Sequence, residues 1–400
     1  MLRSLYSGIS GLRAHQTMLD VTGNNIANVN TQGFKASSVE FQDTLSQMTK
    51  GASAPSATSG GTNAAQVGLG VQVAGIATNF TQGSSQATGK ATDMMISGDG
   101  FFVVHQGGET LYTRAGSLGQ DAQGRLVTPD GAILQGWPAD ANGKVSNGGP
   151  VKDMVLSSQI LSLPQQTKSA TATGNLPSDG SGSPLIREVQ VFDKLGNAQN
   201  VTLTFTASGS PAAWTVSATD GTTTAGPTTM PFTNGSQDTP GTPPVPVDTK
   251  VTLNGMDIHV GAITSYAGLS SVTSKADDGG GAGTLESFTL SKDGTIVGSF
   301  SNGAKQAVGQ IALANFTNPG GLEKAGSSSY RASANSGSAS LGTAGSAGLG
   351  TLVAGSLEMS NVDLSQEFTN LIVAQRGFQA NARIITTSDT VLQELIDLKR

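Results

Sequence analysis

Two amphipathic patterns of the same kind lie at the two extreme ends of this chain. From Leu2, the apolar residues follow one another at alternating steps of three and four, with Gln16 in the one polar slot. The pattern returns near the C-terminus and lasts for about four heptads. Such steps place side chains along one stripe of a helix, as in the seam of a coiled coil. We define the N-terminal seam as Leu2, Leu5, Ile9, Leu12 and Leu19, and the C-terminal seam as Leu364, Phe368, Leu371, Phe378, Ile385, Leu392 and Ile396.

Each seam predicts a terminal helix. A single amphipathic helix usually packs on the core of its own domain. Here neither helix has an obvious domain beside it, and residues 50–63, rich in Gly, Ala, Ser and Thr, separate the first helix from the middle of the chain. We therefore expect the helices to pack on each other or on neighbouring chains. Asp363 with Gln366 predicts a capping box at the start of the second helix.

The middle of the chain, from about residue 66 to residue 349, has the pattern of β-strands. Val201, Leu203 and Phe205 alternate with threonines, which is typical of a strand with one buried face. Pairs such as Asp130-Gly131 and Asn302-Gly303 favour tight hairpins because both residue types tolerate a positive φ angle. We predict a series of antiparallel sheets.

Composition excludes several classes of protein. The chain has 22 Lys+Arg, 28 Asp+Glu and a net charge of −6, without the basic stripe that a nucleic-acid surface needs. It has no cysteine, which excludes disulfides, thiolate metal sites and a thiol nucleophile. No apolar run is long enough to span a bilayer, and the N-terminus lacks the apolar core of a secretory signal peptide. We expect no nucleic-acid binding and no membrane insertion, and any export must use another route.

The sequence offers no recognisable catalytic or metal site. His15, His105 and His259 are not at metal-ligand spacing. The chain has no phosphate-binding loop, dinucleotide fingerprint or nucleophile elbow. Acidic residues such as Asp121 and Asp130 lie close before glycines, which favours a role in turns over acid–base catalysis. We expect no catalytic residue, no metal and no cofactor, and hence no enzyme.

An asparagine cluster directly follows the N-terminal seam. It contains Asn24, Asn25, Asn28 and Asn30. A helix stop followed by turns explains one or two of them, because asparagine hydrogen-bonds the local backbone and tolerates left-handed conformations. Four within seven positions favour a segment whose amides hold the backbone in a fixed irregular path between helix and sheet.

Several long motifs give the chain a specific resemblance. They are LYSGISGL, HQTMLDVTGNNIANVNTQGFK, ISGDGFFVV, YTRAG, LVTPDGAILQGW, VGQIALANF and SNVDLSQEFTNLIVAQRGFQANARIITTSD. In this order they resemble the bacterial flagellar rod and hook proteins, over about residues 1–137 and 293–400. The region between is only loosely family-like.

The resemblance implies a mainly β protein with terminal α-helices and discontinuous domains. Residues 1–35 and 360–400 would form an inner helical domain like a coiled coil, and residues 36–69 a linker or extended segment. Residues 70–149 and 284–359 would form a β-rich middle domain. Residues 150–283 would form an outer β domain.

The resemblance also implies a function. It predicts a subunit of the hook that polymerises into a curved, flexible tube outside the cell and transmits torque from rod to filament. Expected partners are further copies of the chain, the rod protein, the hook cap, the hook–filament junction proteins and the type III export apparatus, without a cleaved signal peptide. We expect both seams and the four asparagines to act in this assembly.

Two alternatives stay open at this stage. A distal rod protein shares the terminal motifs but would be straight and lack most of the region between about residues 150 and 283. A secreted β-rich adhesin would explain the polar strands and low charge, but not the paired terminal heptads.

Overall fold

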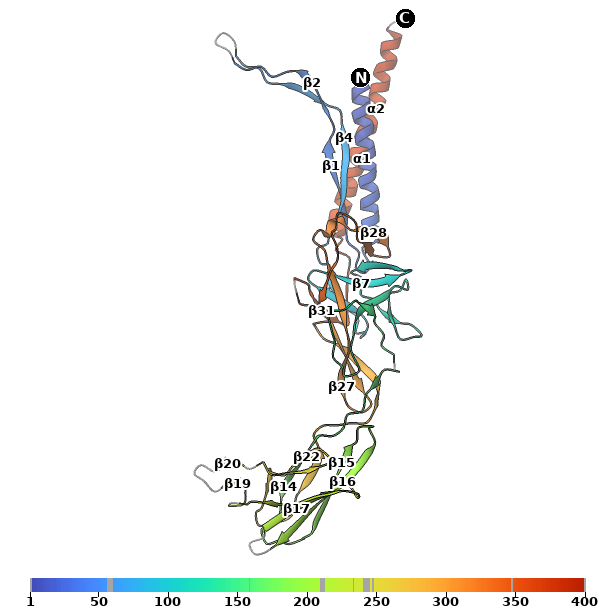
Figure 1. The fold of residues 1–400 in the computed structure, drawn as a ribbon. Helices are drawn as coiled ribbons and strands as arrows, with labels where there is room; N and C mark the ends of the chain where they lie inside the picture. The colour runs from blue at the N-terminus through green and yellow to red at the C-terminus, as the bar shows by residue number, and fades with distance from the viewer. Residues whose placement is uncertain are drawn as a thin grey trace.

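The computed structural model describes residues 2–55, 60–157, 159–208, 213–232, 234–239, 245–246, 248–346 and 348–398. The molecule is elongated (Figure 1). Two terminal helices and a projecting β arm occupy one end, a β domain lies in the middle, and a second β domain forms the other end. The chain passes outward through the middle domain and returns through it. The predicted class, mainly β with helices at both termini and discontinuous domains, is confirmed.

The two terminal helices pack against each other in antiparallel orientation. They are α1 (Leu2–Ala27) and α2 (Leu364–Asp397). Gly8 lies against Ile385, Gly11 against Asn381, and His15 against Gly377. The two residue numbers in each contacting pair add to about 392, and this sum defines how α1 is aligned along α2. Of the two arrangements that the sequence left open, the helices therefore adopt mutual packing within one chain.

Small residues allow the close approach of the helices. A Cβ atom on Gly11 would lie 2.7 Å from the Asn381 side chain, and one on Gly377 would lie 2.5 Å from the His15 ring. Glycine inside a helix costs about 1 kcal/mol relative to alanine. These glycines are therefore explained by the contact between the helices.

The predicted capping box is only half formed. The Asp363 carboxylate accepts hydrogen bonds from the backbone N–H groups of Ser365 (2.8 Å) and Gln366 (3.3 Å). The Gln366 side chain donates to Asn370 instead of reaching back to Asp363. One acidic side chain therefore satisfies the two free donors.

The segment predicted as a linker, together with the residues that follow it, forms a long β arm. Its strands are β1 (Ser37–Asp43), β2 (Ser46–Lys50), β3 (Ala65–Gly68) and β4 (Val71–Thr78). β1 pairs antiparallel with β4 along α1, and β2 pairs with β3 farther out, where the arm leaves the helices (Figure 1). The outer pair is exposed throughout.

The middle domain is built from two distant parts of the chain. The first part contributes β5 (Ser85–Ala87), β6 (Met94–Ser97), β7 (Phe101–Gln106), β8 (Glu109–Thr113), β9 (Gly119–Gln120), β10 (Leu126–Val127), β11 (Ile133–Pro138), β12 (Lys152–Asp153) and β13 (Leu161–Ser162). The second contributes β25 (Gly283–Leu290), β26 (Thr295–Phe300), β27 (Lys305–Asn315), the 3₁₀ turn Pro319–Gly321, β28 (Glu323–Gly326), β29 (Ser329–Arg331), β30 (Ser340–Thr343), β31 (Thr351–Ala354) and β32 (Ser356–Glu358). The long strand β27 joins the parts because it pairs with both β7 and β11.

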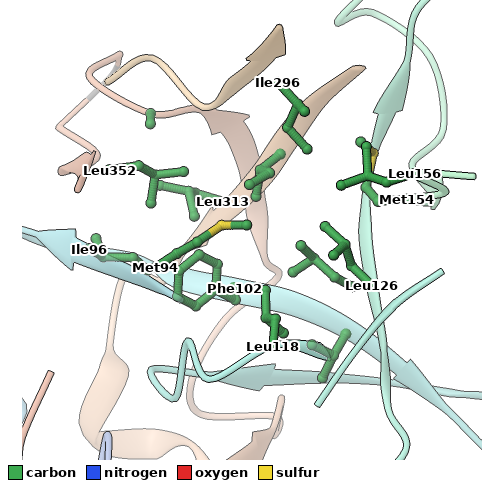
Figure 2. Packing of buried hydrophobic residues seen from close by; sticks show 14 of the residues in the cluster. Met94, Ile96, Phe102, Leu118, Leu126, Met154, Leu156, Ile296, Leu313 and Leu352 are labelled. Atoms are coloured by element: carbon green, nitrogen blue, oxygen red, sulfur yellow. The ribbon is translucent and has the colours of Figure 1, made fainter. Parts of the chain in front are cut away.

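The middle domain has an apolar core on each side of its main sheet. One contains Phe102, Leu126, Ile296 and Leu313 (Figure 2), and the other contains Phe101, Trp137 and Tyr330. Alternate residues of β7 supply the two cores, as the strand period of two requires. Met154 and Leu156 belong to the first core, so that core extends a few residues beyond the boundary predicted at residue 150.

The outer domain has its own core around Phe205, Trp214 and Ile258. Its strands are β14 (Ser169–Asn175), β15 (Leu185–Phe192), β16 (Ala198–Ser208), β17 (Ala213–Thr219), β18 (Thr224–Met230), β19 (Asp238–Thr239), β20 (Val245–Pro246), β21 (Lys250–Leu253), β22 (Met256–His259), β23 (Ile263–Thr264) and β24 (Thr273–Ala276). The β15–β18 sheet is antiparallel, and Val201, Leu203 and Phe205 point into the core as predicted. β14 differs from the prediction because it runs parallel to β22 and β23.

The first testable prediction concerns Tyr330, whose side chain packs against Phe80 and Phe101 and is only 3% exposed. Burial raises the pKa of its phenol to about 12 from 10.0. The folded state therefore holds this proton more tightly, and its stabilising effect is present below pH 10 and is lost as the pH rises from 10 to 12. We expect this one group to account for a loss of about 3 kcal/mol across that window.

The measurement is urea unfolding at pH 9 and pH 11.5, followed by Trp137 fluorescence in a Trp214→Phe background. Tyr330→Phe should lose less stability between the two pH values than the parent. Tyr6→Phe, at an exposed position of α1, is the matched control and should behave like the parent. An equal alkaline loss in Tyr330→Phe and the parent would contradict the assignment.

Candidate functional site

The N-terminal seam lies beside the face of α1 that contacts α2. The contact face contains Gly8 and Gly11, and the seam residues Ile9 and Leu12 follow them by one position each. Consecutive residues are rotated by about 100° around a helix, so the seam and the contact face lie next to each other. Ile9 is 40% exposed, and Leu5, Leu12 and Leu19 are half-buried. The side chain of Leu2 lies outside the described residues. The seam is therefore largely available to another chain.

The C-terminal seam is divided between two environments. Leu371, Ile385 and Leu392 are half-buried, and Ile385 contacts α1 at Gly8. The other four residues are exposed, by 36% to 65% of their surface: Leu364, Phe368, Phe378 and Ile396.

The sequence analysis missed a further apolar row on α2. We call Val373, Ile384, Val391, Leu395 and Leu398 the third row; all five are exposed. Ile384 and Val391 line a hollow of about 380 Å³ together with Ala380, Arg383, Thr387 and Ser388. Ile384 and Val391 directly precede the seam residues Ile385 and Leu392, so from Ile384 onward the row follows the same heptad repeat one residue earlier. This spacing is readable in the sequence.

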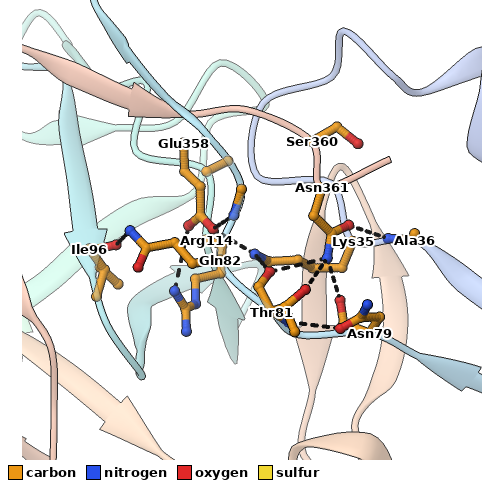
Figure 3. A network of polar contacts seen from close by, with 12 residues as sticks. Lys35, Ala36, Asn79, Thr81, Gln82, Ile96, Arg114, Glu358, Ser360 and Asn361 are labelled. Carbon is orange, nitrogen blue, oxygen red and sulfur yellow. Dashed lines mark hydrogen bonds and ion pairs between the residues drawn. The ribbon is translucent and has the colours of Figure 1, made fainter. Parts of the chain in front are cut away.

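A buried charge cluster connects the helical end to the middle domain (Figure 3). The Lys35 Nζ atom lies 2.6 Å from Glu358 Oε1, and both side chains are fully buried. Arg114 Nη1 lies 3.5 Å from Glu358 Oε2. Lys35 follows α1, Glu358 ends β32 shortly before α2, and Arg114 follows β8. One carboxylate therefore holds three distant segments together.

Backbone groups supply further hydrogen-bond partners to this charge cluster, although Arg114 Nε and Glu358 Oε2 make no hydrogen bond among the residues that the structure describes. Lys35 also donates to the Thr81 carbonyl (2.8 Å), and Arg114 donates to the Gly98 carbonyl (2.8 Å). The backbone N–H of Gly83 donates to Glu358 Oε1 (2.9 Å). The guanidinium also stands over the Phe101 ring, 5.3 Å from its centre. Buried charges require such partners, because isolated ones are costly to remove from water.

Burial governs the protonation of both cations. It lowers the pKa of Lys35, while the hydrogen bond and the charge of Glu358 oppose the shift. It also lowers the pKa of Arg114, again opposed by Glu358. The carboxylate is therefore what keeps two desolvated cations compatible with the fold.

Asn361 forms a second link at the same junction. Its Oδ1 accepts from the backbone N–H of Ala36 (2.8 Å), and its Nδ2 donates to the carbonyls of Asn79 and Thr81 (Figure 3). One side chain thus holds the start of the arm, the end of β4 and the segment before α2.

The asparagine cluster begins inside the helix, not after it. α1 continues through Asn24 and Asn25 to Ala27, which corrects the prediction that the cluster follows the helix directly. Asn25 is 1% exposed, and its amide accepts from the Ser37 N–H (3.0 Å) and donates to the Ser37 carbonyl (2.7 Å). It also donates to Glu367 on α2 (3.1 Å). Asn25 therefore fixes the turn from α1 to the arm. Because Asn25 belongs to α1, the helix holds its side chain where it reaches both Ser37 and Glu367.

The other asparagines have weaker or local contacts. Asn28 donates to the Asn24 carbonyl and accepts from the Thr31 hydroxyl. Asn30 is exposed, and its side chain makes no hydrogen bond within the described part of the chain. Asn24 and Asn28 line a groove of about 600 Å³ between the end of α1 and the middle domain, with Lys324 and Tyr330 on its far side.

The ionisable side chains of the described residues form no metal-binding cluster. Among them, no group of three or more acidic, histidine or cysteine side chains could hold a metal ion. His259 contacts the Asp248 carboxylate at 2.9 Å on the surface of the outer domain. Of the helices described, neither combines the length and the apolar character that crossing a membrane demands.

Comparison with known proteins identifies three family models along the chain. Residues 5–35 match the flagella basal body rod protein family, and residues 95–203 match the flagellar hook protein FlgE/F/G D1 domain. Residues 353–398 match the C-terminal family of the flagellar basal body rod FlgEFG proteins. The first and last matches cover most of α1 and α2.

Full-length relatives extend these matches. The flagellar hook protein FlgE of Borreliella burgdorferi is 39% identical over all of this chain and all of its own length. The flagellar basal-body rod protein FlgG of Bacillus subtilis is 35% identical, also over the whole of both chains. A crystal structure of the Helicobacter pylori hook protein FlgE2 covers 67% of this chain and 98% of its own, with a TM-score of 0.43 and 14% identity.

The fold and the full-length matches define the class: this is a structural protein of the flagellar axis, and the chain belongs to the family of flagellar hook and basal-body rod proteins. Several other hook proteins match over nearly the whole chain. Within the family, the chain is a structural subunit of the hook.

The second prediction tests the buried charge cluster. Glu358→Gln removes the charge that compensates Lys35 and Arg114, and should destabilise the middle domain by about 3 kcal/mol. The measurement is urea unfolding followed by Trp137 fluorescence. Glu109→Gln, which breaks an exposed ion pair with Arg331, is the matched control and should change the midpoint little. Similar midpoints for the two variants would show that the cluster does not support the fold.

The third prediction tests Asn25. Asn25→Ala leaves the Ser37 N–H and carbonyl without their side-chain partner and should cost about 2 kcal/mol. Hydrogen exchange of the Ser37 amide should accelerate, while exchange in the outer domain stays unchanged. Asn30→Ala is the matched control. Unaltered protection of Ser37 in Asn25→Ala would refute the role given to this amide.

Proposed function

We propose that this chain polymerises through its terminal helices into the curved, flexible tube of the hook and there transmits torque from the rod to the filament. The observation that carries the proposal is the apolar surface left uncovered on the paired helices. α1 and α2 already bury one face against each other, yet Ile9, Phe368 and Ile396 remain exposed. Soluble proteins rarely leave such rows uncovered unless another molecule covers them.

Assembly of identical chains by one repeated, non-closing contact produces a helical polymer. Both seams lie on the paired helices at one end of an elongated molecule (Figure 1). In a tube, this end would face the axis, and the middle and outer domains would surround it. The four asparagines would act at the base of this helical end, where Asn25 and Asn28 hold the path from helix to arm.

Torque transmission requires that the helical end not rotate freely against the middle domain. The buried charges of Lys35, Arg114 and Glu358, together with Asn361, supply this resistance in the proposed function. Because these contacts join the segment after α1, the middle domain and the segment before α2, a rotation at the junction would break several of them at once.

The proposed partners beyond further copies are the rod protein, the hook cap, the hook–filament junction proteins and the type III export apparatus. The rod and junction proteins would meet the two ends of the tube, where the same helical surfaces are uncovered. Export without a cleaved signal peptide belongs to the same proposal.

The alternative of a distal rod protein has less support, although one rod protein also matches the whole chain, because hook proteins of several bacteria match it over its full length. The most direct test is electron microscopy of cells that lack this gene. Absence of the curved hook with the rod retained supports the proposal, and normal flagella would refute it.

The fourth prediction tests the seams. Phe368→Asp places a charge on an exposed seam position, so the β domains should still fold while hook assembly fails. The measurements are circular dichroism of the purified chain and counts of hooks per cell. Leu269→Asp, at a position of the outer domain that is 91% exposed, is the control for a surface charge and should leave both measurements unchanged. Normal hook numbers in Phe368→Asp would remove this residue from the assembly surface.

A further inference from the structure

The two helices end at different heights. Because paired residue numbers add to about 392, the start of α1 at Leu2 lies level with Thr390, and residues 391–398 of α2 extend beyond it. Figure 1 shows the C-terminus projecting past the N-terminus. This overhang carries Leu395, Ile396 and Leu398, which are 48%, 65% and 83% exposed. It is about two helical turns long, and nothing in its own chain covers it among the described residues.

We infer that the N-terminal seam of one copy packs antiparallel on the third row of α2 in a second copy, in a register about eleven residues longer than the register within the chain. This inference rests on the proposed self-assembly and specifies its contact. The hollow of about 380 Å³ at Ile384 and Val391 lies at the centre of the contact. The overhang lies at one end of it.

The apolar residues fit this register. When the paired numbers add to 403, Leu5 meets Leu398, Leu12 meets Val391, and Leu19 meets Ile384. Both sets have a spacing of seven, so all three pairs form together. The one polar position of the N-terminal repeat, Gln16, then meets the polar Thr387. In the register within the chain, Leu12 would instead be level with Ala380.

The charges favour the same register. Arg13 would lie level with Thr390, one residue from Asp389, and Asp20 would lie level with Arg383. Within the described residues, none of Arg13, Asp20, Arg383 and Asp389 takes part in an ion pair of its own chain. Two pairs of opposite charge at the edges of an apolar contact set register and orientation more than affinity.

The register has a geometric consequence. A shift of about eleven residues moves one copy by about 16 Å along the helices, at 1.5 Å per residue. The contact joins the N-terminal seam of one copy to the third row of a second copy. The first copy therefore keeps its third row free, and the second copy keeps its N-terminal seam free. Such a contact does not close on itself and propagates as a helix. The occupant of the third row is therefore a further copy of this chain.

Disulfide trapping in assembled hooks tests the register. The chain has no cysteine, so Leu12→Cys with Val391→Cys introduces a single pair. Within one chain these positions are about eleven residues out of register, roughly 16 Å apart, which is too far for a disulfide. After mild oxidation, hooks of this variant should yield a ladder of linked oligomers on a denaturing gel. The matched control is Leu12→Cys with Ile384→Cys, which lies on the same row one heptad away and should yield no ladder.

The outcomes separate this inference from the proposed function. A ladder from the Leu12–Val391 pair alone supports the register. Assembled hooks with no ladder, or with a ladder from the control pair alone, overturn it while leaving the hook function intact. If the parent chain itself does not restore hooks to cells lacking the gene, the proposed function fails.

A charge exchange covers the case in which the cysteine variants do not assemble. Asp20→Arg and Arg383→Asp should each reduce the number of hooks per cell severalfold, because each brings like charges together between copies. The double variant should restore the parental number. Failure of the double variant to improve on either single variant, with circular dichroism unchanged, would overturn the contact.

Discussion

The architecture depends on one constraint: its terminal helices carry more apolar surface than one chain can cover. Glycines at positions 8, 11 and 377 let α1 and α2 approach closely, and this contact uses only one face of each helix. The arm covers part of α1, where the Phe41 ring meets His15. The remaining rows stay exposed, so complete burial of these helices would require further chains, as in the proposed polymer.

A second constraint follows from the first. Surfaces on two helices can direct assembly only if the helices hold a defined orientation relative to the rest of the molecule. The Lys35–Glu358 pair and the Asn25 amide provide this orientation. The ion pair joins the segment after α1 to the segment before α2, and the amide joins the end of α1 to the arm and to α2. A buried ion pair adds little net stability, yet breaking it by removing one partner is costly. Its value here lies in orientation.

Much of this could be predicted from the sequence, and the limits have physical causes. The helices, their cap at Asp363 and the alternation in β16 follow from local patterns, and the structure confirms them. The heptad pattern located an apolar row on α1 but not the contact face, because α1 faces α2 through Gly8, Gly11 and His15, which carry no hydropathy signal. The charge cluster was invisible for another reason: Lys35, Arg114 and Glu358 meet only through tertiary folding. The arm strand β2 was not foreseen because an exposed strand lacks a buried face.

The two connections along the molecule differ in construction. At the helical end, several chain segments converge on buried charges. Between the middle and outer domains, two segments cross, bridged by the backbone hydrogen bonds between Gln165 and Gly280 (2.9 Å each). Gly279 beside them has a φ angle of +88°, a conformation that side chains disfavour. A change of conformation at the second connection would disrupt fewer contacts than one at the helical end, and it would separate no buried ion pair. In the proposed function, this division would keep the axial surfaces aligned while neighbours move, because bending would fall on the connection with fewer interactions.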